Sequence, residues 1–124
     1  MSGEADVKMK DWTSSEDAIL YQTCVACGSV QYFQRRFCCV CGSPDLRVER
    51  ASGCGVVYAI SRVVRAATAE TRAHVPYTIV LVDAVEGFRM MAHGDNELAI
   101  GDNVIAKFTK FTNRLVPYFE RTKP

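Results

Sequence analysis

The sequence has no excess of charge of either sign and very few histidines. Fifteen lysines and arginines stand against 14 aspartates and glutamates, which leaves a formal net charge of +1. A chain this close to neutral has no overall field that attracts polyanions, so any phosphate or nucleic-acid site must be a local patch. With two histidines in 124 residues, the chain also offers little for acid–base chemistry.

Long hydrophobic runs are absent as well. The longest purely apolar run, Val56 to Ile60, is far shorter than the ~18 residues that suggest a membrane span. The first residues, Met1 to Asp6, lack the basic start and apolar stretch of a secretory signal. We therefore expect a cytoplasmic protein with no membrane partner. The hydrophobic content of 48% fits a folded chain of one ordinary domain or two very small ones.

The cysteines are confined to one region of the chain. All six lie between positions 24 and 54, whereas a disulfide framework would spread them, and cytosolic thiols stay reduced. Cys24 and Cys27 form one C-x-x-C pair, and Cys38 and Cys41 form a second pair after ten intervening residues. This doubled spacing predicts a site in which four thiolates hold one metal ion.

Zinc is the expected metal, in a structural role. Each cysteine pair is followed by a glycine, Gly28 or Gly42, which permits the tight turn that directs backbone N–H groups at sulfur. Four thiolates leave no coordination position open to water or substrate. Iron in a rubredoxin-like site is the alternative, because four sulfur ligands suit either metal. Cys39 and Cys54 are interpreted as small, semi-buried hydrophobic residues and not as nucleophiles.

The N-terminal part of the chain is predicted to be a small ribbon. Residues 1–19 are expected to form a polar segment with one short helix, which begins at Ser14 as the N-cap and runs through Leu20. Residues 20–45 follow as a rubredoxin-like zinc ribbon with a strand over Val30–Phe33. Because domains below ~40 residues rarely fold by core burial alone, the metal is expected to be essential to the ribbon.

Residues 46–124 are predicted to form a β-barrel, which makes the whole chain mostly β. This part is rich in Val, Ile, Tyr and Phe and is broken by turn residues. Residues 46–49 alternate at the start of this part, and the five principal strands are expected over residues 56–64, 77–85, 88–92, 104–111 and 115–120. Residues 66–74 are expected to be a loop. Five principal strands without a strong helix favour a closed OB-type barrel with no exposed edges, and an SH3-like barrel is the alternative.

Two sets of motifs follow one another along the chain. The ribbon set comprises Cys24-x-x-Cys27-Gly28, Tyr32-Phe33-Gln34-Arg35 and Cys38-Cys39-Val40-Cys41-Gly42-Ser43. The barrel set comprises Gly53-x-Gly55, Val57-Tyr58, Pro76-Tyr77, Val82-Asp83, Glu86-Gly87, Ile100-Gly101-Asp102 and Val104. Together, over residues 12–120, they resemble the zinc-ribbon plus OB-fold proteins that are associated with acyl-CoA and are often partners of thiolases. Cys39 and Phe33-Gln34 stand where that family has prolines.

The resemblance implies a non-catalytic, zinc-binding subunit of a thiolase-type acyl-CoA enzyme complex. A partner would supply the catalytic cysteine and histidine, while this chain helps to bind or admit the CoA ester for thiolytic cleavage. The length and layout are similar to those of the small subunits of aromatic-degradation thiolases such as benzoylsuccinyl-CoA thiolase. Because arginine suits bidentate phosphate contacts, the candidate contacts with CoA or the partner are Arg35, Arg36, Arg62 and Arg65.

The residues themselves offer no frame for catalysis by this chain alone. Acyl transfer needs a nucleophile, a base and an oxyanion site, and no serine elbow or P-loop is present. Gly53-x-Gly55 lacks the third glycine of a dinucleotide-binding fingerprint. His74 and His93 lie next to turn residues, and we interpret them as surface or turn residues.

Two other functions stay open. In a single-stranded nucleic-acid-binding protein, the cluster Tyr32, Phe33, Arg35, Arg36 and Phe37 would stack on bases and contact phosphates. Against this, residues 1–50 contain six basic and seven acidic residues, and four thiolates with one divalent ion would turn the charge of +1 into −1. The second alternative is a rubredoxin-like electron carrier, which requires iron in place of zinc.

Overall fold

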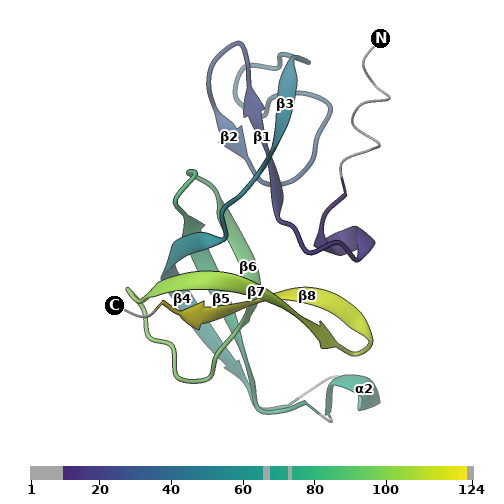
Figure 1. The fold of residues 1–124 in the computed structure, drawn as a ribbon, viewed down its shortest axis with the longest axis vertical. Coiled ribbons are helices and arrows are strands. Elements are labelled where there is room, and N and C mark those ends of the chain that lie inside the picture. Colours follow the sequence, from purple (N-terminus) through teal and green to yellow (C-terminus); the bar gives the residue numbers. More distant parts are fainter. Residues whose placement is uncertain (1–9, 66–67, 73, 123–124) are drawn as a thin grey trace.

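The computed structural model describes residues 10–65, 68–72 and 74–122, which form a small three-stranded sheet followed by a closed barrel (Figure 1). In chain order the elements are η1 (Trp12–Ser14), β1 (Leu20–Cys24), β2 (Val30–Gln31), β3 (Leu46–Arg50), β4 (Cys54–Val63), α2 (Ala69–Arg72), β5 (Tyr77–Ala84), β6 (Arg89–Gly94), β7 (Asn103–Phe111) and β8 (Arg114–Arg121). The predicted mostly β architecture with a five-stranded barrel is confirmed. No helix in the described ranges is long and apolar enough to cross a membrane.

The ribbon sheet has the order β2-β1-β3, with antiparallel neighbours. Residues 46–49 were expected to open the barrel, but β3 pairs with β1 over its whole length, from Leu20 opposite Arg50 to Cys24 opposite Leu46. Strand β1 is buried at four of its five positions, so it needs a neighbour on both edges to satisfy its backbone groups. By hydrogen bonding, β3 is therefore part of the ribbon sheet.

The predicted N-terminal helix is wrong in position and type. The structure has a single 3-10 turn over Trp12–Ser14, and its N-cap is Asp11, whose carboxylate accepts a hydrogen bond from the Thr13 N–H at 3.0 Å. Ser15 then adopts a left-handed conformation with φ of 68° and ends the turn. The chain from Ala18 onward is buried and leads directly into β1, because pairing with β3 stabilises the extended form.

The connection between β4 and β5 also differs from its prediction as a loop. A single helical turn, α2, lies within it and begins after Thr68, whose side chain accepts a hydrogen bond from the Thr71 N–H at 3.2 Å. The sequence contains this N-cap signal, but one turn of helix is too short to show a hydrophobic period. Residues 66, 67 and 73 of the predicted loop lie outside the described ranges.

The barrel strands have the order β4-β5-β6-β8-β7, and β7 returns to β4. Closure between β6 and β8 is parallel and involves only two pairs, His93 opposite Tyr118 and Gly94 opposite Phe119. Alternate residues of each strand fill the interior, as a half-buried sheet requires. The buried residues at the centre are Val57, Val80, Val82, Met90, Ala92, Val104 and Phe119.

Gly55 permits the tightest approach in the barrel. Strand β4 pairs there with both of its neighbours, Ala84 on β5 and Val104 on β7. A Cβ atom at residue 55 would lie 2.6 Å from the Asp83 carbonyl oxygen and 2.6 Å from Val82 Cγ1. The second glycine of the Gly53-x-Gly55 motif thus lets β4 pack close enough to β5 for the barrel to close.

Stacked aromatic rings join the ribbon to the barrel. Phe88, at the start of the β6 side of the β5–β6 hairpin, stacks on Tyr21 of β1 with ring centroids 5.1 Å apart and on Tyr32 with centroids 5.3 Å apart. The indole of Trp12 donates a hydrogen bond to the Tyr32 hydroxyl at 3.0 Å. Ile19 and Tyr21 belong to the same buried cluster as the barrel core. The two parts therefore pack through one continuous apolar core.

Replacing Phe88 with Ala should destabilise the packing between the ribbon and the barrel. The phenyl ring is buried between two tyrosines, and truncation of such a ring costs about 3–5 kcal/mol of unfolding free energy. Denaturant unfolding of the metal-loaded chain measures the loss. The matched control is Val85→Ala in the same hairpin, where the side chain is exposed and the change should stay within about 0.5 kcal/mol. Equal effects of the two substitutions would contradict the stacking account.

Candidate functional site

The four predicted ligand cysteines form one compact cluster. The sulfur atoms of Cys24, Cys27, Cys38 and Cys41 all lie within 4.8 Å of one another. Cys24 Sγ is 3.6 Å from Cys41 Sγ, and Cys27 Sγ is 3.6 Å from Cys38 Sγ. A tetrahedral zinc ion with Zn–S bonds of about 2.3 Å holds its sulfurs about 3.8 Å apart. The cluster therefore has the size of a four-thiolate metal site.

The two knuckles have the same local geometry. Gly28 and Gly42 adopt φ of +82° and +80°, and their N–H groups donate to the Cys24 and Cys38 carbonyls, both at 2.9 Å. A Cβ atom at either position would have no other atom within 4 Å, so there is room for a side chain. Glycine is favoured there because of the positive φ angle. The turns direct the Cys27 N–H at Cys24 Sγ and the Cys41 N–H at Cys38 Sγ, each at 3.4 Å.

The pKa shifts and the mutual repulsion of the four thiolates favour binding of a cation between the sulfur atoms. Hydrogen bonding by the side chain and backbone of Ser29 lowers the pKa of Cys27 to about 6. Backbone N–H groups, that of Cys41 first, lower the pKa of Cys38. At Cys41 the Ser43 backbone lowers the pKa, but the neighbouring sulfurs and burial outweigh it and raise the pKa to about 12. Four thiolates at this spacing repel one another, and a divalent ion removes that cost.

The remaining two cysteines lie outside the cluster. Cys39 is exposed beside the second knuckle, which corrects its interpretation as semi-buried, and its N–H donates to Gln31 Oε1 at 3.0 Å. Cys54 begins β4 and is half-buried, as predicted. The structure thus places Cys38, and not Cys39, with the other three ligands.

Two buried glutamines hold the ribbon loop, defined here as residues 32–37. Gln22 and Gln31 are opposite each other in the β1–β2 pair, and Gln31 Nε2 donates to Gln22 Oε1 at 2.7 Å. Gln22 also accepts from the Arg35 N–H and donates to the Arg35 carbonyl, both at 3.0 Å. Gln31 donates to the Phe37 carbonyl at 3.4 Å. These bonds end β2 at Gln31, so the strand predicted over Val30–Phe33 is shorter than expected.

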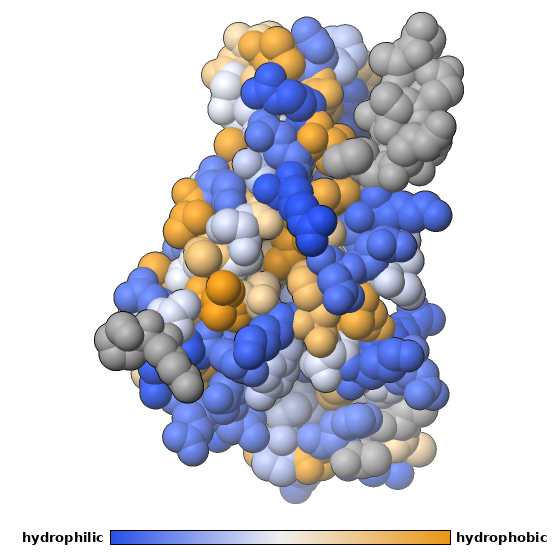
Figure 2. Space-filling view, viewed as in Figure 1, coloured by the Kyte–Doolittle hydropathy of each residue, from blue (hydrophilic) through white to orange (hydrophobic). Residues whose placement is uncertain are grey.

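The ribbon loop presents cationic and aromatic side chains to solvent. Phe33 is 69% exposed, Phe37 is 55% exposed, and Arg35 and Arg36 are exposed between them. The view in Figure 2 shows hydrophobic residues at the ribbon end of the molecule beside hydrophilic ones. Because the two glutamines fix the loop backbone, these side chains project from a rigid base. No local signal marks the two glutamines as loop anchors, because they fit an ordinary strand pattern.

The four candidate arginines lie in two different places. Arg35 and Arg36 belong to the ribbon loop, whereas Arg62 and Arg65 are at the end of β4 that leads toward α2 (Figure 1). The Arg62 guanidinium donates to the Asn96 carbonyl, and Arg65 is exposed. Contact of either pair with CoA or a partner stays a prediction.

His74 is exposed and lies in a turn, as predicted, whereas His93 differs from its interpretation as a surface or turn residue. His93 is a half-buried residue of β6, and its ring lies against Phe111 of β7 with centroids 4.2 Å apart. His74 packs on the same phenyl ring with centroids 4.5 Å apart, although it is exposed. Burial, and to a smaller extent the charge of His74, lowers the pKa of His93. Their meeting depends on barrel closure, which no local sequence signal reveals.

Comparisons with known proteins identify both parts of the chain. The model of the C-terminal OB-fold domain of ChsH2 matches residues 48–109, and that of the rubredoxin-like zinc ribbon domain of ChsH2 matches residues 15–47. A solved chain described as an Ltp2-ChsH2(DUF35) aldolase is 24% identical, with a TM-score of 0.71 over 84% of each chain. A DUF35-family protein of unknown function from Sulfolobus solfataricus is 15% identical, with a TM-score of 0.57 over 86% of this chain and 77% of that one. No curated protein matches.

Removal of a ligand cysteine should abolish metal binding and unfold the ribbon. Structural zinc in small fingers contributes an apparent ~10–16 kcal/mol at neutral pH, more than a three-stranded sheet can supply by packing. For Cys24→Ser we expect loss of stoichiometric metal in elemental analysis and loss of amide protection in β1 to β3. The matched control is Cys39→Ser, in which metal content and protection should be unchanged. A metal-loaded Cys24→Ser protein with a protected ribbon would overturn the assignment.

Truncation of Gln22 should free the ribbon loop without releasing the metal. In Gln22→Ala the Arg35 N–H loses its acceptor, so its hydrogen exchange should accelerate roughly fivefold, the equivalent of ~1 kcal/mol for one hydrogen bond. Exchange measured by NMR at Arg35 and Cys39 reports the effect, and Gln34→Ala, at an exposed position of the same loop, is the control. Unchanged exchange at Arg35 in Gln22→Ala would show that the glutamine does not hold the loop.

Proposed function

Because the chain belongs to the ChsH2 family, in which a rubredoxin-like zinc ribbon precedes an OB-fold domain, we propose that it is the non-catalytic subunit of a thiolase-type enzyme complex acting on CoA esters. The similarity to the Ltp2-ChsH2(DUF35) aldolase supports this most directly, since it spans 84% of both chains. That protein's description joins a ChsH2 chain to an aldolase. An equivalent partner would bring the catalytic groups to this chain.

The metal centre supports an accessory role. We propose zinc as the metal, since the ligand set and its spacing are those of structural zinc sites. Such an ion would hold the two knuckles together and would leave no coordination position for substrate. Iron would instead make the protein an electron carrier, and a visible absorption spectrum separates the two metals.

The reaction belongs to the partner. For a thiolase-type partner it is the thiolytic cleavage of a 3-oxoacyl-CoA, in which the bond between the α and β carbons breaks. The aldolase description of the similar structure concerns that protein, and it shares with thiolysis the breaking of a carbon–carbon bond. Benzoylsuccinyl-CoA stays a prediction for the substrate, and the cytoplasm stays a prediction for the location.

The ribbon loop is the proposed contact with the partner or the CoA ester. Its two arginines can each hold a phosphate oxygen pair or a carboxylate through two N–H groups. Its two exposed phenylalanines add apolar area of the kind that is buried at protein interfaces. The fixed backbone lowers the ordering cost of binding, because the loop already has one conformation.

The test is co-expression with candidate thiolase-type enzymes encoded near the gene, followed by purification through a tag on this chain. We expect one of them to copurify, and its cleavage of CoA thioesters to be stronger with this chain than without it. A double substitution, Arg35→Ala with Arg36→Ala, should weaken assembly or raise the KM for the CoA ester about tenfold, as expected for lost charge-assisted bonds.

The control for this experiment is Arg47→Ala, which removes an exposed arginine of β3 whose guanidinium pairs with Glu49. It should leave assembly and KM unchanged. A partner enzyme that is fully active alone and never forms a complex would refute the proposed function. Equal effects of the double substitution and of Arg47→Ala would refute the role of the ribbon loop and leave the function standing.

A further inference from the structure

The outer side of strands β4, β5 and β6 is apolar, although it faces solvent. Side chains alternate along a strand, so the neighbours of the buried core residues point away from the barrel interior. Met91 is 62% exposed and Tyr58 is 51% exposed. A contiguous apolar surface of this kind marks an interaction site when it is large. The outer face, as we name it, comprises Val56, Tyr58, Ala59, Ile79, Leu81 and Met91.

A β-bulge in β4 directs Tyr58 to the outer face. The register with β5 shifts between Val57 and Ala59, so Tyr58 is the extra residue in the ladder. A bulge re-aims one side chain and increases the local twist of the strand. Val56 and Ala59, which an unbroken strand would place on opposite sides, therefore both belong to the outer face.

Tyr58 is held in place by a neutral ion pair. The Arg89 guanidinium carbon lies 3.5 Å from the centroid of the Tyr58 ring. Arg89 Nε also donates a hydrogen bond to Asp83 Oδ1 at 2.6 Å, which compensates both charges. Tyrosine and arginine are among the residue types that carry most of the binding energy at protein interfaces. Their fixed arrangement lowers the ordering cost of binding.

A groove of about 330 Å³ runs across the outer face. Ala59 is opposite Leu81 and Ser61 is opposite Ile79, so small side chains on β4 leave a hollow beside larger ones on β5. Met91 of β6 also lines the groove. None of the described residues in its lining is charged. The groove therefore suits apolar side chains and offers no counter-ion to a charged ligand.

The ribbon loop alone is too small to hold a partner protein. A stable interface uses ~20–30 residues and about 800 Å² on each partner, roughly a tenth of this chain's accessible surface of 7960 Å². Residues 32–37 are far fewer than that. If the ribbon loop contacts a partner, a second surface on the same side of the molecule must complete the interface.

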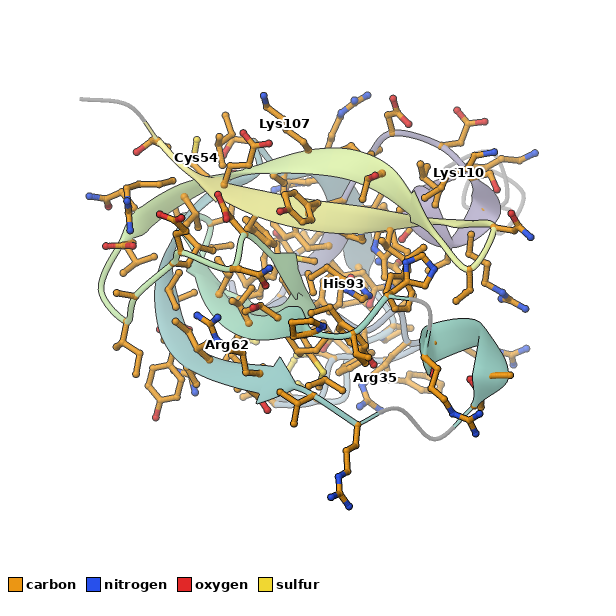
Figure 3. The ribbon with its side chains drawn as sticks, turned by 90° about the horizontal axis from the view of Figure 1, so that it is seen from below. Arg35, Cys54, Arg62, His93, Lys107 and Lys110 are labelled. Atoms are coloured by element: carbon orange, nitrogen blue, oxygen red, sulfur yellow. The ribbon has the colours of Figure 1, made fainter. Side chains whose placement is uncertain are left out.

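The outer face lies on the same side of the molecule as the ribbon loop. In the view of Figure 3, Arg35 lies on the side where β4 runs, whereas Lys107 and Lys110 lie on the opposite side, on β7. The outer face and the ribbon loop can therefore meet one flat partner surface together.

Contacts between side chains lead from the ribbon loop to the outer face. The ring centroid of Phe33 is 5.4 Å from that of Tyr32, which is 5.3 Å from that of Phe88. Phe88 directly precedes Arg89, whose guanidinium lies over Tyr58. The two surfaces are thus connected through the aromatic cluster that packs the ribbon against the barrel.

The charges on this side favour an acidic partner. Arg35 and Arg36 take part in none of the ion pairs formed by the described part of the chain. Neither the ribbon loop nor the outer face contains an acidic residue. Carboxylates of a partner would complement the two arginines through paired N–H groups. A second copy of this chain would bring none to these surfaces.

We propose that the outer face and the ribbon loop form one interface for the catalytic partner. The partner's contact surface inserts an apolar side chain into the groove and presents carboxylates to Arg35 and Arg36. The assignment rests on the proposed function, because its occupant is the thiolase-type enzyme. It adds the outer face, and Tyr58 and Met91 in particular, to the contact with that enzyme.

Limited oxidation of methionine by tert-butyl hydroperoxide tests the interface without a substitution. In the free metal-loaded chain Met91 should oxidise readily, whereas Met90, one residue earlier and 3% exposed, is the internal control. In the complex purified through a tag on this chain, Met91 should oxidise at least about fivefold more slowly, because oxidation follows exposure. Tandem mass spectrometry measures both rates. An unchanged rate at Met91 in the assembled complex would overturn the proposal.

Two substitutions measure the contribution of the outer face to affinity. Tyr58→Ala should weaken assembly about thirtyfold, as loss of a central interface residue does. Met91→Lys places a charge in the apolar groove and should weaken assembly by at least as much. The matched control is Val64→Lys, at a residue that is 67% exposed and lies outside the groove. Metal content and denaturant unfolding of the free variants confirm that they fold.

The outcomes separate failure of the interface from failure of the proposed function. If the enzyme copurifies and both variants assemble like the wild-type chain, the outer face is not the interface and the proposed function stands. If no enzyme copurifies with the wild-type chain, the proposed function fails and this interface fails with it. A dimer of the free chain that Met91→Lys dissociates, seen by light scattering, would assign the outer face to a second copy and overturn the proposal. Should Tyr58→Ala fail to fold, Met91→Lys compared with Val64→Lys decides the question.

Discussion

The closure of four thiolates around one metal ion is the constraint on which the rest of the ribbon depends. The ribbon sheet has three short strands, and Val25, Phe33, Phe37 and Val40 in its loops are exposed. A segment of this size does not fold by burial alone. The metal closes the two knuckles, and the knuckles in turn set the β1–β2 register that places Gln22 opposite Gln31. Loss of the ion would therefore release the ribbon loop together with the sheet.

The stacked rings of Tyr21, Phe88 and Tyr32 pack the ribbon against the barrel. Through them the ribbon and the barrel share one buried apolar cluster, and the molecule has two chemically different surfaces. One surface is the ribbon loop, with its arginines and exposed phenylalanines. The other is the end of the barrel where Tyr77, His93 and Phe111 line a cavity.

Much of this structure could be predicted from the sequence because the signals are local. The C-x-x-C spacing defined the four ligands, and the alternation of apolar residues from Val56 to Glu120 defined the barrel strands. The helix predicted from Ser14 was wrong because a capping signal one turn earlier, at Asp11, and pairing with β3 outweighed local propensity. Strand β3 was placed in the barrel region because sequence alternation does not say which sheet a strand joins.

The two features that the sequence did not reveal depend on long-range pairing. Gln22 and Gln31 look like ordinary strand residues until the β1–β2 register makes them opposite neighbours. His93 on β6 and Phe111 on β7 belong to strands that are not neighbours in the sheet, and their rings meet because the barrel is closed. In each case the two residues are brought together by strand pairing, and their spacing along the chain matches no helical or strand periodicity and no known motif.

Native mass spectrometry of the chain co-expressed with its partner tests the central claim most directly, since one spectrum reports both metal content and assembly. The account predicts a hetero-oligomer with one divalent metal ion per copy of this chain, and release of the chain from its partner when the ion is removed by mild chelation. A complex that persists with metal-free chain, or a metal-loaded chain that stays alone, would contradict it.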